Sequence, residues 1–240
     1  MEAIIGGIPM QIHGFNKTTL LDYPEHLAAT IFLGHCNFRC PFCHNASLVL
    51  APEKQPTIPA VDVINTLKER QGILEGVCIT GGEPTLTHDL PDFIAQIKDL
   101  GLKVKLDTNG SNPLMLSYLL DQHLLDYVAM DIKNSKEQYN KTIGLSSSCM
   151  DQVIESISLL KQSNLPYEFR TTIVSEFHRM DDILSIGEWL HGSPAYYLQK
   201  FIDSGNLLQN GLHAASRETM LAYKEALKPH FKVVELRGMD

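Results

Sequence analysis

The sequence predicts an α/β protein whose parallel strands form a partial, open (β/α)6 barrel of the TIM-like kind. Short apolar runs recur along the chain, and most are continuous rather than alternating, as in strands buried on both faces of a parallel sheet. Amphipathic segments with helix start signals separate these runs. Each unit of one strand and one helix is roughly 25–40 residues long. About six such units fit into 240 residues, fewer than the eight of a closed barrel.

The predicted strands share apolar runs rich in β-branched and aromatic residues. They cover residues 27–33, 77–80, 104–107, 127–131, 167–174, 196–201 and 231–236. We expect a single domain over residues 1–240. It consists of an N-terminal extension (1–26), the core partial barrel (27–202), and a C-terminal helix with a last strand (203–240).

The helix starts are predicted from capping residues and proline. Pro59 opens a helix over 61–71, and Asp89 precedes another over 93–100. Asn112 followed by Pro113 fits an N-cap and a proline at the first helical position. The same reasoning makes two further residues N-cap candidates, Asp181 and Ser216.

Composition narrows the class of protein. The net charge is −8, so the basic footprint of a nucleic-acid-binding protein is absent. No apolar run approaches the roughly 18–20 residues that a membrane span needs. The N-terminal residues carry Glu2 where a secretory signal has a basic residue, so we expect a cytoplasmic protein. Five cysteines, three of them within 36–43, do not resemble a disulfide framework and favour a metal or catalytic site.

The three clustered cysteines are Cys36, Cys40 and Cys43, spaced C-x3-C-x2-C directly after the first predicted core strand. Three thiolates on one tight loop can hold three irons of a cubane and leave the fourth iron open. A structural zinc site completed by His35 or His44 is an alternative, and residues 40–44 also match the C-x-x-C-H signal for haem attachment. Three buried thiols without a function are the remaining possibility.

Polar residues follow the ends of the other strands, where barrels of this class place their active sites. These residues could also have purely structural roles. Gly81-Gly82 would then be a plain turn, Asp107 and Asn109 would form turns, and Asp131 would pair with Lys133 or Arg170. We expect Cys78 to be a core residue because it lies inside a strand. The candidate site residues are Thr80, Gly81, Gly82, Glu83, Asp107, Thr108, Asn109, Asp131, Lys133 and Arg170.

The cysteine triplet, with aromatic Phe42 just before its last cysteine, resembles the radical S-adenosylmethionine (SAM) superfamily. The resemblance implies a [4Fe–4S] cluster held by Cys36, Cys40 and Cys43, with SAM bound to the open iron. It further implies cofactor contacts in which Glu83 and the two glycines hold the amino group of SAM. Those contacts are Phe42, Thr80, Gly81, Gly82, Glu83, Asp107, Thr108, Asn109, Asp131, Lys133 and Arg170. A monovalent cation is implied beside Asp107, Thr108 and Asp131.

Residues 17–24 (KTTLLDYP), 28–34 and the cysteine loop are similar to one branch, the glycyl-radical-enzyme activating proteins of anaerobic (class III) ribonucleoside-triphosphate reductase. The resemblance covers about residues 12–202, with Glu25 where the branch usually has glycine. It implies abstraction of a hydrogen atom from a backbone glycine of the reductase, with a flavodoxin or ferredoxin as electron donor. Activation of another glycyl-radical enzyme, such as pyruvate formate-lyase, and a reaction on a small molecule remain alternatives.

Overall fold

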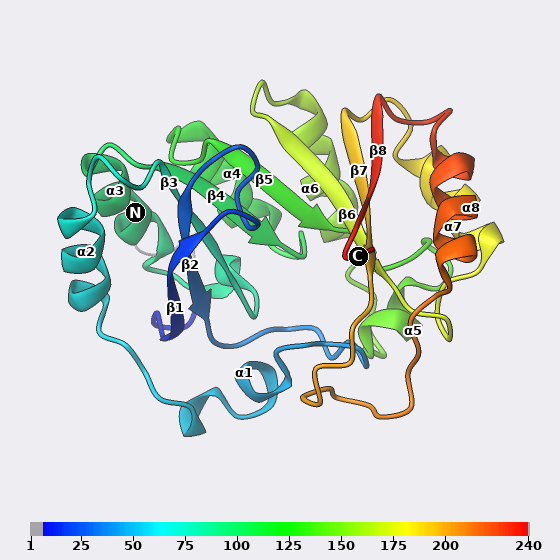
Figure 1. The fold of residues 1–240 in the computed structure, drawn as a ribbon, viewed down its shortest axis with the longest axis horizontal. Helices are drawn as coiled ribbons and strands as arrows, with labels where there is room; N and C mark the ends of the chain where they lie inside the picture. Colours follow the sequence, from blue (N-terminus) through cyan, green and yellow to red (C-terminus); the bar gives the residue numbers. More distant parts are fainter. Residues whose placement is uncertain (1–6, 240) are drawn as a thin grey trace.

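The computed structural model describes residues 7–239, in which eight strands form one sheet (Figure 1). The strands lie side by side in chain order. β1 is antiparallel to β2, and every later neighbouring pair is parallel. The strands are β1 Ile12–Thr19, β2 Ala28–Leu33, β3 Gly76–Gly81, β4 Lys103–Thr108, β5 Tyr127–Asp131, β6 Tyr167–Ile173, β7 Ala195–Lys200 and β8 Val233–Arg237. The order ends at β1 and β8, so the sheet is an open barrel.

The predicted fold class is confirmed. All seven predicted strands form, and no bound differs from the prediction by more than two residues. The N-terminal part was incompletely predicted, because the segment expected to be an extension over 1–26 contains β1, which pairs with β2. Residues 1–6, including Glu2, lie outside the described residues.

Most helices alternate with the parallel strands and cover the outer side of the sheet, whereas α1 lies below the ends of the strands (Figure 1). α3 contacts β4, and α8 contacts both β7 and β8. The helices are α1 Ala46–Leu50, α2 Ala60–Glu69, α3 Leu90–Asp99, α4 Pro113–Asp121, α5 Tyr139–Ile143, α6 Met150–Gln162, α7 Met180–Trp189 and α8 Arg217–Leu227.

Two helix starts have the side-chain caps predicted from the sequence. The Asn112 side chain accepts a hydrogen bond from the Met115 N–H at 3.2 Å, which caps α4 as predicted. Ser216 caps α8 in the same way. The prediction for Asp181 was wrong, because α7 starts after Arg179 and Asp181 lies within its first turn.

Side chains alternate across each strand, and this alternation separates the core from the inside of the barrel. In β4, the apolar residues Val104 and Leu106 are fully buried. Lys105 and Asp107 belong to the opposite face, where Asp107 reaches a cavity at the carboxyl ends of the strands. The sheet therefore presents a polar inner surface below this cavity. Among residues 7–239, no helix combines the length and apolar character needed to cross a bilayer.

Candidate active site

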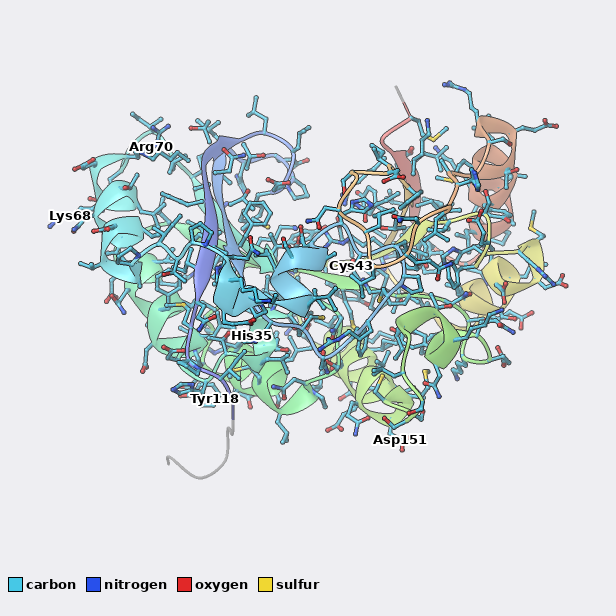
Figure 2. The ribbon with its side chains drawn as sticks, turned by 90° about the horizontal axis from the view of Figure 1, so that it is seen from below. His35, Cys43, Lys68, Arg70, Tyr118 and Asp151 are labelled. Atoms are coloured by element: carbon cyan, nitrogen blue, oxygen red, sulfur yellow. The ribbon has the colours of Figure 1, made fainter. Side chains whose placement is uncertain are left out.

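The loop that follows β2 carries the three clustered cysteines, and backbone hydrogen bonds fix its course. The Arg39 N–H donates to the Ile143 carbonyl of α5 at 2.8 Å, and the Cys43 N–H donates to the Cys40 carbonyl at 3.0 Å. The Arg39 guanidinium donates back to the carbonyls of Cys36 and Phe38, at 2.6 and 2.8 Å. The loop is thereby held against α5, and Cys43 lies near the middle of the molecule (Figure 2).

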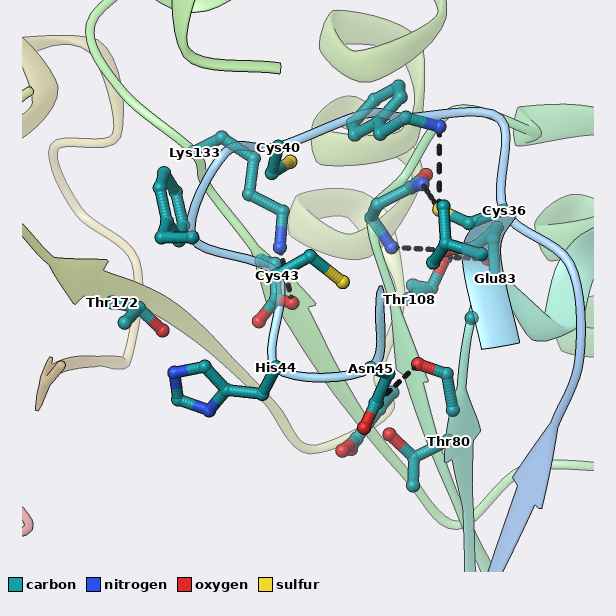
Figure 3. Close-up of a pocket in the computed structure, with 18 of the residues that line it drawn as sticks. Cys36, Cys40, Cys43, His44, Asn45, Thr80, Glu83, Thr108, Lys133 and Thr172 are labelled. Carbon is teal, nitrogen blue, oxygen red and sulfur yellow. Dashed lines mark hydrogen bonds and ion pairs between the residues drawn. The ribbon is translucent and has the colours of Figure 1, made fainter. Parts of the chain in front are cut away.

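All three cysteines line one cavity of roughly 230 Å³ at the carboxyl ends of the strands (Figure 3). Every candidate residue named from the sequence lines the same cavity, although these residues come from the cysteine loop and from β3 to β6. Sequence reasoning assigned no cofactor contact to five further lining residues. These are Phe38, His44, Asn45, Val49 and Thr172.

The sequence contains weak indications that some of these five residues line the cavity. Thr172 lies two residues after Arg170 on β6, so strand alternation places both side chains on the inner face. Asn45 follows the last cysteine, and its side-chain amide donates to the Gly81 carbonyl at 2.9 Å. Burial and the nearby Lys133 lower the pKa of His44, whose ring lies 5.6 Å from that of Phe201.

The glycine pair after β3 is required by close packing of two backbone segments. The Gly82 N–H donates to the Leu33 carbonyl at 2.8 Å, and the Glu83 N–H donates to the His35 carbonyl at 2.7 Å. Gly81 adopts a φ of +119°, which residues with a side chain rarely adopt. A Cβ at Gly82 would overlap the His35 carbonyl. The turn therefore packs directly on the start of the cysteine loop.

The Glu83 carboxylate is almost completely buried and joins the turns after β3 and β4. It accepts hydrogen bonds from the Thr85 N–H at 3.2 Å, the Thr85 hydroxyl at 2.5 Å and the Thr108 hydroxyl at 2.7 Å. The Asn109 N–H donates to its second oxygen at 2.6 Å. Burial raises the pKa of Glu83, and these four donors oppose that rise. Glu83 thus organises the strand ends in addition to lining the cavity.

A chain of five charged side chains on β4, on β6 and at the end of β5 crosses the floor of the site. Lys105 pairs with Asp107, which also pairs with the Arg170 guanidinium at 3.0 Å. Arg170 pairs with Asp131 at 2.5 Å, and Asp131 pairs with Lys133 at 2.8 Å. The ion pair predicted for Asp131 is therefore confirmed, because this carboxylate pairs with both Lys133 and Arg170.

Charge neighbours dominate the titration of these carboxylates. Burial alone would raise the pKa of Asp107, but Arg170 and Lys105 hold it below its usual value. Burial opposes ionisation of Asp131 in the same way, yet Arg170 and Lys133 lower its pKa even further. Both carboxylates are ionised at neutral pH, so the chain of three cations and two anions carries a net charge of +1.

The charges already present do not favour the expected monovalent cation beside Asp107, Thr108 and Asp131. Both oxygens of Asp107 and both oxygens of Asp131 already pair with nitrogen cations. The Thr108 hydroxyl donates to Glu83. A sodium or potassium ion would have to share these oxygens and would add a further positive charge to a chain that already carries a net charge of +1.

The cysteine thiols are free and protonated in the chain alone. Burial, together with the nearby Glu83, raises the pKa of Cys36 to about 12. Burial raises the pKa of Cys40 to about 11. Cys78 is fully buried inside β3 and does not line the cavity, which agrees with the core role predicted for it. Binding of a metal cluster at this loop would release the thiol protons.

Comparison with known proteins identifies the family. The model of the radical SAM superfamily matches residues 30–190, which include most of β2, the cysteine loop and β3 to β6. The chain belongs to the radical SAM superfamily. Enzymes of this family use a [4Fe–4S] cluster and SAM, and so does this one.

The donor set of this radical SAM enzyme fits that cluster. Three thiols lie on one loop in the cavity, while the other two cysteines, Cys78 and Cys149, do not line it. Three thiolates leave one iron of a cubane without a protein ligand. Within residues 7–239, no three cysteine, histidine or acidic side chains converge on a point that could hold a single ion. A cubane does not require such convergence, because each of its irons takes one thiolate.

Two groups of relatives extend the comparison. A protein of Methanocaldococcus jannaschii, provisionally named a glycyl-radical enzyme activating enzyme, is 31% identical over 205 residues, which are 84% of this chain and 81% of that protein. A protein of Sulfurisphaera tokodaii, provisionally named GTP 3′,8-cyclase, is 36% identical over 128 residues, 51% of this chain and 38% of that protein.

Solved structures share the fold. SuiB of Streptococcus suis, bound to its precursor peptide SuiA, matches with a TM-score of 0.65 at 14% identity over 84% of this chain and 46% of its own. TYW1 with a bound lysine–pyruvate adduct matches with a TM-score of 0.61 at 16% identity over 84% of this chain and 72% of its own. The chain therefore spans about half the length of SuiB and has the same core architecture.

Proposed function

We propose that this enzyme activates an anaerobic (class III) ribonucleoside-triphosphate reductase by abstracting a hydrogen atom from a backbone glycine of that protein. The observation that carries the proposal is the 31% identity to a provisionally named glycyl-radical enzyme activating enzyme over 84% of this chain and 81% of that protein. Similarity over most of both lengths supports a shared reaction type. The segment from Lys17 to Pro24 supports the reductase as the partner.

The site residues divide into cluster ligands and SAM contacts. Cys36, Cys40 and Cys43 would each hold one iron. One iron would have no protein ligand and would be free to bind SAM. The turn at Gly81-Gly82 lies against the cysteine loop, so it would present its backbone to the amino group of SAM. The remaining SAM contacts would come from residues on the same cavity wall: Phe42, Thr80, Glu83, Asp107, Thr108, Asn109, Asp131, Lys133 and Arg170.

When bound, the cluster and SAM supply one-electron reductive cleavage of a carbon–sulfur bond and the hydrogen-atom abstraction that follows it. The chain supplies orientation and exclusion of water. Phe42 is 5% exposed and packs near the ring of Phe177, so it shields the cysteine loop. Lys133 and Arg170 line the cavity with positive charge that suits a carboxylate, while Asp107 and Asp131 hold both cations in place.

A protein substrate is compatible with the open sheet, because β1 and β8 are its two edges and the barrel is not closed. The match to the provisionally named GTP 3′,8-cyclase covers only 51% of this chain and includes the core common to the family. It gives less support to a small-molecule substrate. We further propose that the enzyme works in the cytoplasm and takes its electron from a flavodoxin or ferredoxin.

The proposal is tested with reconstituted enzyme under strict anaerobiosis. The enzyme, a reductant and SAM are mixed with the reductase of the same organism or with a pyruvate formate-lyase, and electron paramagnetic resonance spectra are recorded. We expect a glycyl-radical doublet with the reductase and none with the Cys40→Ala variant. A doublet only with the lyase would reassign the partner. Formation of 5′-deoxyadenosine without either doublet would point to a different substrate.

A further inference from the structure

Lys105 is the most unusual charged residue below the active-site cavity. It is only 2% exposed, and lysine side chains are almost never fully buried unless they are paired. Its ammonium group pairs with Asp107 and lies 3.7 Å from the Cys78 sulfur. Lys105 does not line the cavity, whereas Asp107 does. A ligand in the cavity would therefore contact Asp107 and not Lys105.

The strand geometry explains how this ammonium reaches its partner. Lys105 and Asp107 are two residues apart on β4, so their side chains project from the same face. The flexible four-carbon stem of lysine places a compact charge beside the carboxylate. Burial alone would lower the pKa of Lys105, but the adjacent Asp107 carboxylate raises it above its usual value. The ion pair with Asp107 therefore favours the charged form of the side chain.

Every oxygen of the two carboxylates around this ammonium already pairs with a nitrogen cation, so a metal ion would join three positive charges. Asp107 uses one oxygen for Lys105 and the other for Arg170. Asp131 uses one oxygen for Arg170 and the other for Lys133. Three cations are thus built into a place where the sequence resemblance implies a monovalent metal ion.

We propose that the Lys105 ammonium replaces that metal ion as the positive charge behind Asp107, so that SAM binding by this enzyme needs neither sodium nor potassium. Lys105 is then a positioning residue, which holds Asp107 ionised and fixed while Arg170 and Lys133 face the ligand. The proposal rests on SAM occupying the cavity and does not depend on which protein the enzyme activates.

The experiment measures the dissociation constant of SAM for the reconstituted, anaerobic enzyme in buffers that contain tetramethylammonium, sodium or potassium as the only monovalent cation. For the natural enzyme we expect the three values to agree within about twofold. Lys105→Ala removes the charge and leaves space, so we expect at least tenfold weaker binding in tetramethylammonium and restoration to within about threefold by potassium or sodium.

Two further variants separate charge from packing. Lys105→Met removes the charge but fills the space, so we expect weak binding that no cation restores. Lys103→Ala, at an exposed lysine on the same strand, serves as the matched control and should behave as the natural enzyme. Circular dichroism and iron content show whether each variant is folded and loaded.

Several results would overturn the inference. More than fivefold tighter SAM binding by the natural enzyme in potassium or sodium would show that a metal ion is still required, and this measurement needs no variant. A folded, loaded Lys105→Ala enzyme that binds SAM weakly in every buffer, or normally in every buffer, would reduce Lys105 to a packing role. A natural enzyme that binds no SAM in any buffer would overturn the placement of SAM itself, and the inference with it.

Discussion

Arg170 is the central member of the ion chain, so its removal gives the sharpest test of how the site is held together. Its guanidinium joins Asp107 on β4 to Asp131 on β5, at 3.0 and 2.5 Å. The Arg170→Met variant keeps an apolar stem of similar length. Asp107 and Asp131 each lose one cationic partner in this variant. Removing one partner of a buried ion pair costs roughly 3–5 kcal/mol. Since the Asp131 side chain is 26% exposed, we expect a loss of about 3 kcal/mol in the free energy of unfolding.

The assay is urea unfolding or thermal melting of the apoprotein, followed by circular dichroism. For a chain of this length, 1 kcal/mol shifts the midpoint temperature by about 2–4 °C, so we expect the midpoint to fall by about 6–12 °C. Arg217→Met is the control, because Arg217 is exposed and lies far from the ion chain in sequence. A change below about 1 kcal/mol, or an equal change in the control, would refute the view that Arg170 ties the strands together.

The same variant has a pH signature. The folded-state pKa values of Asp107 and Asp131 lie below the usual value of about 3.9. A lowered carboxyl pKa contributes stability that is fully present above the usual value and is lost as the pH falls toward the folded-state value. The natural enzyme should therefore lose stability as the pH falls below about 4. Arg170→Met should lose less across the same interval, and equal acid sensitivity of both proteins would contradict the assignment.

Three more changes test the cysteine loop and its supports. Cys40→Ala should bind less iron after reconstitution, while Cys78→Ala should bind a normal amount because Cys78 lies in the core. Colorimetric analysis measures the iron content. Equal loss of iron in both variants would contradict the assignment of Cys40 as a ligand and Cys78 as a core residue. Gly82→Ala should distort the cysteine loop and lower iron content, whereas Gly205→Ala, where a Cβ meets open space, should cost only about 1 kcal/mol. Glu83→Ala leaves four donors without their acceptor, and we expect about 3 kcal/mol of destabilisation in urea unfolding.

Much of the site could be predicted because parallel strands bring their carboxyl ends to one edge. Residues as distant as Cys36 and Arg170 could be placed together from the strand order alone, and the cavity contains both. β1 was missed because its burial is mixed and it has no continuous apolar run, so periodicity gave no strand signal. Its half-buried character follows from its position at the edge of the sheet.

The pairing of charges could be predicted only in part, for Asp131 with Lys133 and Arg170. Lys105 lies between two apolar residues of a buried strand, and the sequence alone does not show which carboxylate neutralises it. The side-chain partners of Glu83 were missed for a related reason, because they come from the turns after two different strands. The contacts of Glu83 with the turn after β4 depend on the register between β3 and β4, which only the folded sheet defines.

The central claim is that this enzyme takes a hydrogen atom from a backbone glycine of the reductase. The most direct measurement uses reductase produced with glycine deuterated at its α-carbon, mixed anaerobically with reconstituted enzyme, a reductant and SAM. The mass of the 5′-deoxyadenosine formed is then determined. We expect each molecule of 5′-deoxyadenosine to carry one deuterium, and its amount to rise together with the glycyl-radical signal. Unlabelled 5′-deoxyadenosine in the presence of active, deuterated reductase would contradict it.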